Sequence, residues 1–398
     1  MSEEERLWAA LEEEIPAAVA LRRRLHAEPD LSGDESATRD IVIAALPADA
    51  CVTKVAHTGA VLRIGGPGPA VGLRGEMDAL PVTERTVLPF ASTRPGVMHA
   101  CGHDAHMAAA VAVAGAVRRV DGATPLLLVL QPREETYPSG AEDVVGSGVL
   151  LAEQCVTMVG AHVQPSLPPG DVACAPGGVN ASSDEFTIVV HGQPGHAAYP
   201  HLARDPVLAL SAVVVALQSV VSRAVDPMSP AVVGVSALQA GRAANVVPGT
   251  ATARGTVRAL STATRALLHE RIDDVARSVA QAHGCTAEVT FVRGEPVLEN
   301  DPALVKQVAA HLSRRGVRVS TALRSVGSDD FSFYAERWPS VMLFVGTDTD
   351  VPLHSDGFAA SDEDVARVAR SLLAAYLGAR DHLASSAATT SGDWGLRE

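Results

Sequence analysis

The sequence MHACGHDAH at residues 98–106 places one thiol, three imidazoles and a carboxylate within nine positions. A single glycine separates Cys101 from His103, so a thiolate and an imidazole can close on the same divalent ion. Asp104 and the alanine-rich run after it predict the start of a helix. An isolated C-x-H pair is more typical of a buried small thiol beside ordinary histidines. The metal-site interpretation therefore depends on the rest of the chain.

The predicted strands lead into residue types that bind metals. Apolar, β-prone runs at 125–131, 156–161 and 341–346 predict short buried strands. Candidate donors follow each strand directly or after a short loop: Glu134 and Glu135 after the first, His162 after the second and His354 after the third. Each of these residues alone would be an ordinary loop or core residue. Because sites in open α/β sheets form outside the carboxyl ends of strands, we expect these donors to meet Cys101 and His103.

The number and type of these donors predict a catalytic centre with two metal ions. Five protein donors exceed the four of a closed tetrahedral zinc site, so a pair of divalent ions sharing a water fits better. If one of the neighbouring glutamates binds metal, the other is placed to act as general base toward that water. Hydrolysis of an amide is the expected reaction. A zinc deaminase also activates water, but its H-x-E and P-C-x-x-C signature is absent from the sequence.

Several motifs, in the same order along the chain, resemble those of the M20 metallopeptidase family. They are RLHAEPD (24–30), LRGEMDALP (73–81), MHACGHDAH (98–106), QPREE (131–135), GHAAYP (195–200), NVVP (245–248) and GSDDF (327–331). Within the family they look most like the amidohydrolase branch, which includes aminoacylases, hippurate hydrolases and plant auxin-conjugate hydrolases. The resemblance extends from about Arg24 to about Ala375.

The resemblance implies a role for each matching residue. The ligands of a two-metal centre are matched by Cys101, His103, Glu135, His162 and His354. Glu134 matches the general base. Asp78 matches an acidic residue that orients the metal ligands without binding metal itself. His196 and Asn245 match lid residues that stabilise the oxyanion, often in the active site of the partner subunit.

Some residues depart from the family pattern without removing a donor. Glu76 stands where aspartate is more common, Arg133 where a small residue precedes the two glutamates, and Asp356 where a proline follows the last histidine. The stretch 137–139 replaces a more glycine-rich one. These departures affect the size and charge of the pocket, so the preferred acyl group and amino acid stay open. Capping or packing explains three further residues beside the ligands: His99, Asp104 and His106.

The expected function is that of a metal-dependent amidohydrolase. It would cleave N-acyl or N-aroyl amino acids, or related small conjugates, to a carboxylate and a free amino acid. Zinc suits one thiolate among imidazoles and a carboxylate, but manganese, cobalt or nickel could occupy the same donors. Carboxypeptidase, dipeptidase or desuccinylase chemistry is an alternative, because fold does not select among amides. A catalytically silent metal-binding or ligand-binding dimer is the alternative of another class.

Composition is typical of a cytoplasmic enzyme rather than a nucleic-acid or membrane protein. The net charge of −14 provides no basic surface for nucleic acid or anionic lipid. Five cysteines without a C-x-x-C pair favour a reducing compartment. Residues 1–21 are acidic and helical in pattern, unlike a secretory signal. The most apolar segment, Val207–Val225, is interrupted by polar residues and is expected to be a buried helix, at an interface between subunits.

The order of predicted elements indicates a two-domain α/β metallohydrolase. Helix-like and strand-like periods alternate over residues 1–180, as in the first part of an α/β catalytic domain. Residues 181–295 follow the order strand, helix, strand, strand, helix, strand of a ferredoxin-like α+β domain. We expect this inserted domain to serve as lid and homodimerisation domain. The catalytic domain resumes over 296–380, and the small polar residues 381–398 predict a disordered tail.

Overall fold

The computed structural model of the protein describes residues 1–46 and 51–389. The chain divides into two compact units. The first comprises Met1–Gly177, Glu299–Leu323 and Phe333–Glu398, and the second comprises Gly178–Leu298 and Arg324–Ser332. The segment 324–332 was expected in the catalytic domain. It joins the second unit because Ser325 forms a parallel bridge with Asn180 and its carbonyl accepts the Ala181 N–H at 3.1 Å.

The first unit is built on an eight-stranded sheet in the order β1-β2-β4-β3-β5-β16-β6-β15. Its strands are β1 (Cys51–Val55), β2 (Gly59–Ile64), β3 (Ala70–Glu76), β4 (Leu126–Gln131), β5 (Cys155–Gln164), β6 (Val172–Ala173), β15 (Val319–Ser320) and β16 (Ser340–Gly346). Strands β4, β3, β5 and β16 are parallel neighbours, so their carboxyl ends share one edge of the sheet. Four β4 leucines are fully buried, and burial of each side chain stabilises the fold by about 1.5–3 kcal/mol.

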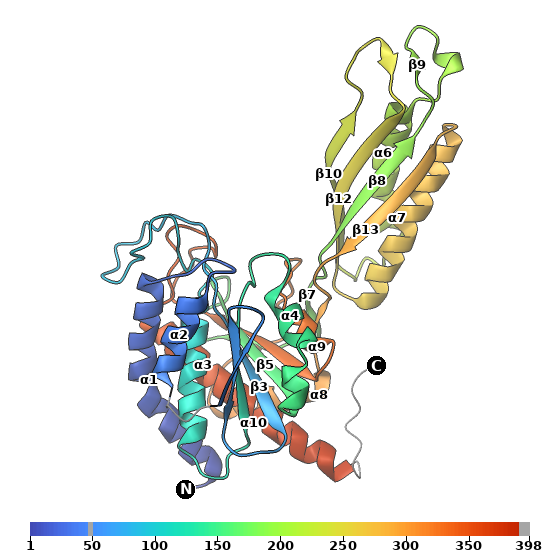
Figure 1. The fold of residues 1–398 in the computed structure, drawn as a ribbon. Helices are drawn as coiled ribbons and strands as arrows, with labels where there is room; N and C mark the ends of the chain where they lie inside the picture. The colour runs from blue at the N-terminus through green and yellow to red at the C-terminus, as the bar shows by residue number, and fades with distance from the viewer. Residues whose placement is uncertain (47–50, 390–398) are drawn as a thin grey trace. The chain divides into compact units, whose positions relative to one another are not determined.

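Helices cover the sheet of the first unit. They are α1 (Glu3–Ala27), α2 (Ser36–Ala45), α3 (His103–Arg118), α4 (Gly140–Gly146), α5 (Val149–Ala152), α8 (Pro302–Arg314), α9 (Ser332–Ala335) and α10 (Asp362–Thr389). Helices α1, α3 and α10 pack against one another beside the sheet (Figure 1). Because α3 is buried on nearly every side, its small alanine side chains allow close packing with its neighbours.

Two predicted boundaries in the first unit were wrong. The strand predicted to end at His162 continues to Gln164, because β16 stays paired with it until Gly346 lies opposite Gln164. The last helix was expected to end near Ala379, but α10 runs to Thr389. Arg380 pairs with Glu3 at 3.2 Å, which ties this part of α10 to α1. The rest of the predicted tail, 390–398, lies outside the described residues.

The second unit contains the predicted ferredoxin-like order of elements. These are β8 (Asp184–His191), α6 (Pro206–Ala224), β10 (Ala231–Ala240), β12 (Thr250–Ala259), α7 (Thr262–Ala282) and β13 (Thr286–Arg293). The strands form an antiparallel sheet in the order β10-β12-β8-β13. Helices α6 and α7 pack on one face, around a core that includes Phe186, Leu217 and Leu268. Short strands complete the chain: β7 (Gly177–Asn180), β9 (Gly195–His196), β11 (Val246–Val247) and β14 (Leu298–Asn300), with a 3₁₀ turn at Pro200–Leu202.

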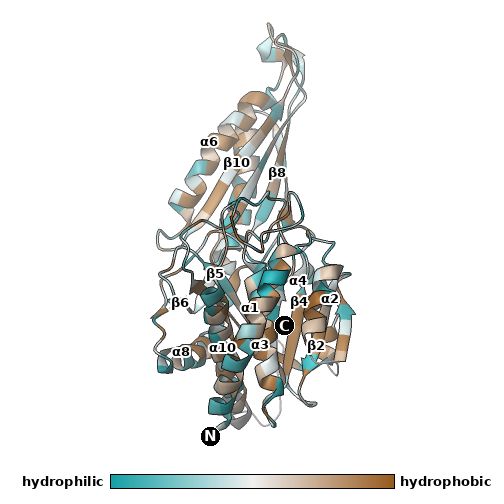
Figure 2. Ribbon diagram, turned by 90° about the vertical axis from the view of Figure 1, so that its left-hand side faces the viewer, coloured by the Kyte–Doolittle hydropathy of each residue, from teal (hydrophilic) through white to brown (hydrophobic). Residues whose placement is uncertain are grey.

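Helix α6, expected to be a buried helix at an interface, buries one side in the second unit and exposes the other. Apolar residues run along it (Figure 2), and by length and composition alone it could cross a membrane. Leu210 and Val213 face the core of the second unit, whereas Leu208 and Val215 are 58% and 73% exposed. We call Val207, Leu208 and Val215 the exposed α6 face. An apolar face of this kind on a folded domain is typical of an interface.

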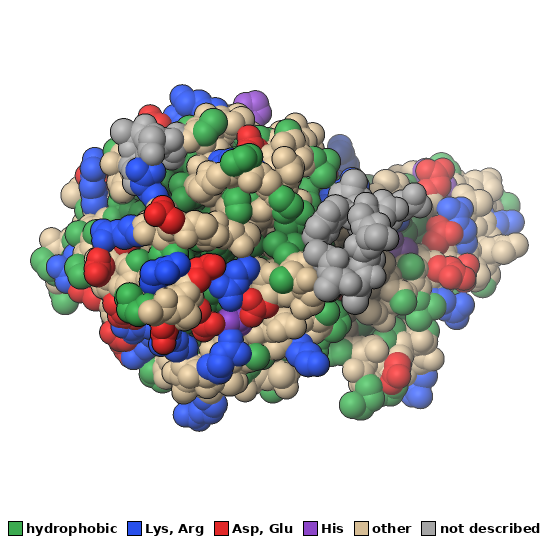
Figure 3. Space-filling model, turned by 90° about the horizontal axis from the view of Figure 1, so that it is seen from below, with side chains coloured by type: hydrophobic (Ala, Val, Ile, Leu, Met, Phe, Trp, Pro, Cys, Tyr) green, Lys and Arg blue, Asp and Glu red, His purple; other side chains and the backbone are tan. Residues whose placement is uncertain are grey.

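Ion pairs balance the acidic surface of the first helix. Basic and acidic side chains lie interleaved over the face shown in Figure 3. Arg119 pairs with Glu13 at 2.7 Å and with Glu14 at 2.6 Å, and Arg370 pairs with Glu12 at 2.9 Å. Exposed pairs of this type contribute at most about 1 kcal/mol each. The acidic segments of α1 thus form a solvated, charge-paired side of the helix.

A buried charged network joins α1 to the start of α3. Asp104 accepts hydrogen bonds from Arg22 Nε and from His26 Nδ1, both at 2.8 Å. The other ring nitrogen of His26 lies 3.2 Å from Glu84 Oε1. Burial alone would lower the pKa of His26, but the charge and hydrogen bond of Asp104, with Glu84, raise it to about 9. His26 is therefore protonated in the folded protein at neutral pH.

This raised pKa predicts a pH-dependent stability. A group whose pKa is higher in the folded state stabilises it fully below the unfolded pKa and loses that effect as pH rises through the folded pKa. Between pH 6.5 and pH 9 the unfolding free energy of the wild type should therefore fall by about 3 kcal/mol relative to that of His26→Gln. Urea denaturation of both proteins at the two pH values measures the difference. Parallel pH profiles would show that His26 is not charged in the fold.

Candidate metal centre

The turn before α3 needs the glycine between Cys101 and His103. Gly102 has φ of +83°, a conformation that glycine adopts without steric penalty. A Cβ atom at this position would lie 2.6 Å from Val163 Cγ2, so a larger residue would also collide with β5. Helix α3 begins directly afterwards, at His103. The C-G-H sequence thus sets the positions of a thiol and an imidazole at the edge where β5 ends.

The five predicted ligands lie together in the first unit. Cys101 Sγ is 3.3 Å from the Nε2 atoms of both His162 and His354. His354 Nε2 is also 3.3 Å from Glu135 Oε1. His103 and Glu135 belong to a second group of possible ligand atoms, which includes Glu134 and whose members lie within 4.8 Å of one another. The structure therefore brings together donors that are separated by up to 253 positions in the chain.

Asp78 connects the two glutamates to His103. Its carboxylate accepts the backbone N–H groups of Glu134 at 3.1 Å and Glu135 at 2.9 Å. Its carbonyl oxygen lies 2.8 Å from His103 Nδ1, and since a carbonyl only accepts, that nitrogen carries the proton. Burial would raise the pKa of Asp78, but the hydrogen bond and charge of His103 and the backbone donors lower it to about 2. Asp78 is therefore a carboxylate that orients three candidate site residues without being one of the clustered ligands.

The three histidines each point a ring nitrogen at the cluster. His162 donates from Nδ1 to the Val163 carbonyl at 2.7 Å, which leaves its Nε2 lone pair facing Cys101. His103 Nε2 is buried without a hydrogen-bond partner among the described residues. His354 has φ of +64° and is held by a 2.8 Å hydrogen bond from its N–H to the Ala100 carbonyl. Its side chain is 54% exposed, so the His354 side of the cluster faces solvent.

This donor set fits divalent metal ions. Burial raises the pKa of the Cys101 thiol well above its usual range, so the thiolate needs a positive charge beside it. A metal ion supplies that charge and also provides a partner for the orphaned His103 Nε2. One sulfur, three imidazole nitrogens and carboxylate oxygens are the donors that zinc and similar transition metals bind.

Two of the three residues assigned to packing, Asp104 and His106, have hydrogen-bond partners, whereas both ring nitrogens of His99 are buried without one among the described residues. Asp104 binds Arg22 and His26, as described above. The Val163 N–H donates to His106 Nε2 at 2.9 Å, and the His106 ring lies 4.6 Å from that of His162. His99 is buried, and burial lowers its pKa to about 4, so its ring is neutral.

The departures from the family pattern lie around the cluster. Glu76 is buried and pairs with Arg74 at 2.8 Å. The Arg133 side chain folds back along its own loop, donating to the Pro138 carbonyl at 3.2 Å and pairing with Asp143. Asp356 lies 3.2 Å from Arg85, whose side chain is largely exposed, whereas that of Asp356 is about half exposed. Of these three charged residues, only Asp356 adds a partly exposed charge, two residues from His354.

His196 and Asn245 lie side by side in the second unit. Strand β9 pairs with β11, and the Ala197 N–H donates to the Asn245 carbonyl at 3.0 Å. Both residues are exposed. The Ala198 N–H donates to His196 Nδ1 at 3.1 Å, so in the neutral ring the proton is on Nε2. The neutral His196 ring thus has one N–H that can donate a hydrogen bond.

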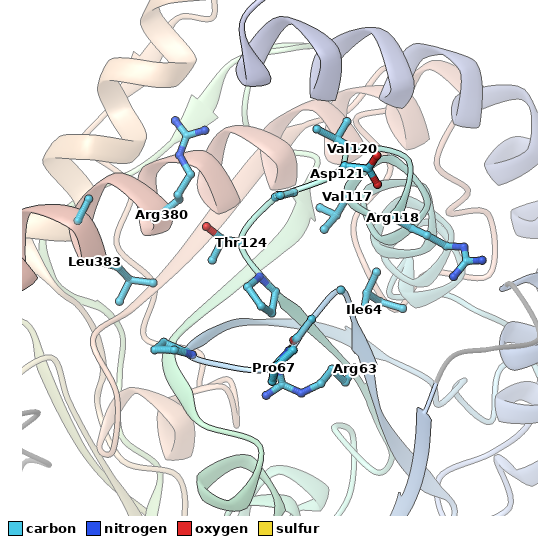
Figure 4. A pocket seen from close by; sticks show the side chains of 17 residues that line it. Arg63, Ile64, Pro67, Val117, Arg118, Val120, Asp121, Thr124, Arg380 and Leu383 are labelled. Carbon is cyan, nitrogen blue, oxygen red and sulfur yellow. The ribbon is translucent and has the colours of Figure 1, made fainter.

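A cavity of about 900 Å³ lies elsewhere in the first unit (Figure 4). Arg63, Asp121 and Leu383 are among its lining residues, and it adjoins Pro125, just before β4 begins. Glu134 follows the other end of β4, and a six-residue strand spans roughly 20 Å. Arg63 and Arg380 are already paired, with Glu153 and Glu3. This cavity is therefore separate from the candidate metal centre.

A family model describes most of this chain. The model of peptidase family M20/M25/M40 matches residues 72–378. The chain belongs to this family. The M20 chain is 35% identical over 368 residues to the N-acetyldiaminopimelate deacetylase of Halalkalibacterium halodurans, covering 91% of this chain and 99% of the relative. The corresponding Bacillus subtilis deacetylase is 34% identical over 346 residues, covering 85% and 92% of the two chains.

Solved structures agree with the family assignment. A candidate aminohydrolase from methicillin-resistant Staphylococcus aureus has a TM-score of 0.88 at 30% identity, covering 94% of the M20 chain and all of the other. The YXEP protein of Bacillus subtilis, a dinuclear metal binding peptidase from the M20 family, has a TM-score of 0.83 at 28% identity, covering 93% and 99%. The predicted family and α/β fold class are thus confirmed. The M20 chain is a metal-dependent hydrolase of amides, and its ligand cluster supports two divalent ions.

Proposed function

We propose that the protein hydrolyses the amide bond of N-acyl amino acids, with N-acetyl derivatives of diamino acids such as diaminopimelate as the first candidates. The observation that carries the proposal is the position of Glu134. It directly precedes Glu135 in the cluster, and Asp78 holds the backbone N–H groups of both. The named activity of the two deacetylases, which align with most of this chain, supports acetyl as the acyl group.

We assign the ligands of two ions to the five clustered donors, Cys101, His103, Glu135, His162 and His354. Bound there, the ions would supply Lewis acidity to the amide carbonyl and to the attacking water. Zinc is the proposed native metal because of the thiolate, with manganese, cobalt and nickel as the alternatives.

The protein's own groups move the protons in this proposal. Glu134 removes a proton from water, and the water oxygen forms a bond to the carbonyl carbon. Glu134 then returns the proton to the amide nitrogen as the C–N bond breaks, which releases a carboxylate and a free amino acid. His196 Nε2–H and the Asn245 amide are the proposed donors to the oxyanion.

We also propose that the protein is a cytoplasmic homodimer. The exposed α6 face and the outer edge of β10, where Leu238 is 61% exposed, support association of two second units. Five free cysteines, four of them buried, support a reducing compartment. Sedimentation velocity measures the mass in solution and tests the dimer.

A substrate panel tests the proposed function. Metal-loaded protein should release amine from N-acetyl amino acids faster than from benzoyl or succinyl amino acids or from dipeptides. A chelator should abolish the release, and added zinc or manganese should restore it. Preference for dipeptides would favour the peptidase alternative, and preference for succinyl substrates the desuccinylase. Full metal binding without any turnover would favour a silent binding protein.

A further inference from the structure

The residue before the two glutamates has an unusual backbone conformation. Arg133 has φ of +52°, in the left-handed region that residues with a Cβ atom rarely occupy. Strand β4 ends at Gln131, and Arg133 is the last residue before Glu134. Its backbone therefore sets the direction in which the chain presents Glu134 and Glu135. Such a conformation persists only where the surrounding structure holds it.

The Glu35 carboxylate holds the Arg133 backbone in this conformation. Its Oε1 atom accepts the backbone N–H of Arg133 at 2.9 Å and that of Gly33 at 2.8 Å. Its Oε2 atom accepts the Thr58 hydroxyl at 2.6 Å. The side chain is fully buried, so no water competes for these bonds. A buried carboxylate with several donors is a strong and geometrically specific acceptor.

The chain around Arg133 has little room to adopt another path. The Arg133 carbonyl accepts the Gly140 N–H at 3.1 Å. A Cβ atom on Gly140 would lie 1.7 Å from the Pro132 carbonyl oxygen, so the two segments pack backbone against backbone. A change at the Arg133 N–H would therefore move Glu134 and Glu135 rather than be absorbed locally.

Two buried carboxylates, Asp78 and Glu35, hold the three consecutive N–H groups of residues 133–135. Those of Glu134 and Glu135 bind Asp78, whose Oδ2 atom also accepts the Ser32 hydroxyl at 2.7 Å. The N–H of Arg133 binds Glu35, three residues after Ser32. We propose that Glu35 is a positioning residue for the hydrolysis: it holds Arg133 in the left-handed conformation and so sets the positions of Glu134 and Glu135. This inference rests on the roles proposed above for the two glutamates.

Two substitutions of Glu35 separate its acceptor oxygen from its charge. Glu35→Ala removes the acceptor, and we expect kcat to fall by about 10²-fold with KM nearly unchanged, as for a small misplacement of a reacting group. Metal affinity, measured by titration with Co²⁺, should fall by about 10–100-fold because Glu135 shifts. Glu35→Gln keeps an acceptor oxygen and should retain most of both.

A second-site change distinguishes positioning from general stability. Glycine adopts positive φ freely, so Arg133→Gly in the Glu35→Ala background should restore kcat by at least about 10-fold. Asp301→Ala is the control: it removes two backbone hydrogen bonds at the start of α8, at 2.9 and 3.0 Å, and should lower thermal stability without changing kcat.

Two results would overturn the proposal. The first is that Glu35→Ala leaves both kcat and Co²⁺ affinity unchanged. The second is that adding Arg133→Gly to Glu35→Ala restores neither kcat nor Co²⁺ affinity. The Co²⁺ titration measures metal affinity, which depends on the position of Glu135 and does not require turnover. If Glu134 were not the general base, the Co²⁺ titration would still show whether Glu35 positions Glu135. Failure of the proposed function and failure of the Glu35 proposal are therefore distinguishable.

Discussion

Glu134→Gln is expected to bind its full complement of metal and to lose about 10²–10⁴-fold in kcat, the usual contribution of a general acid–base residue. The amide retains the size of the side chain and an acceptor oxygen but cannot take a proton from water. The five clustered donors are untouched, so metal content should match that of the wild type. Metal analysis of the purified variant and initial rates on an N-acetyl amino acid measure the two quantities.

Glu142→Gln is the matched control for this substitution. Glu142 is an exposed carboxylate in the first turn of α4, and its substitution removes the same charge from the same segment of the first unit. Its kcat should stay within about twofold of the wild type, as expected of an exposed surface position. A fully active Glu134→Gln with normal metal content would exclude Glu134 as the general base.

Cys101→Ala is expected to produce the second large effect, a loss of metal affinity of more than about 100-fold, since even residues behind the ligands contribute 10–100-fold. Turnover at limiting metal should disappear with it. With Co²⁺ in place of the native ion, the wild type should show a thiolate-to-cobalt charge-transfer band that the variant lacks. The other ligands keep their positions, because His103 and His162 are tied to backbone carbonyls at 2.8 and 2.7 Å.

Cys174→Ala controls for the loss of a buried thiol. Cys174 is fully buried in the core of the first unit, and burial raises its pKa to about 12, so it is a neutral thiol. This variant should keep both the metal affinity and the cobalt band. A charge-transfer band that survives in Cys101→Ala would mean that another cysteine binds the metal.

The candidate ligands could be predicted because strand direction carries positional information. Glu135, His162 and His354 all follow or end apolar runs, and parallel strands bring such positions to one edge of a sheet. The order of elements in the second unit was equally readable, since its helices and strands have clear apolar periodicity. In both cases the apolar pattern lies within one short segment, so each element can be predicted without knowing its tertiary contacts.

Other features depend on tertiary contacts that leave little trace in the sequence. Arginine does not favour positive φ, so nothing in the letters QPREE predicts the conformation of Arg133. Glu35 resembles any glutamate near a helix start, and its partner is 98 positions away. The extension of β5 past His162 follows from pairing with β16 rather than from its own residues. The sequence of α6 predicts an apolar helix at an interface, but which of its side chains face the core of the second unit depends on how the helix packs there.

The alanine content of α3 limits how this enzyme could be re-engineered. The helix packs closely against α1, α10 and the sheet, so most of its side chains have no room to be larger. Its first residue is His103. A larger side chain at one of its buried positions would collide with the neighbouring elements and displace the helix, and His103 with it. Libraries that seek new acyl preferences should therefore leave this helix unchanged and diversify solvent-facing positions such as Arg85 and Asp356.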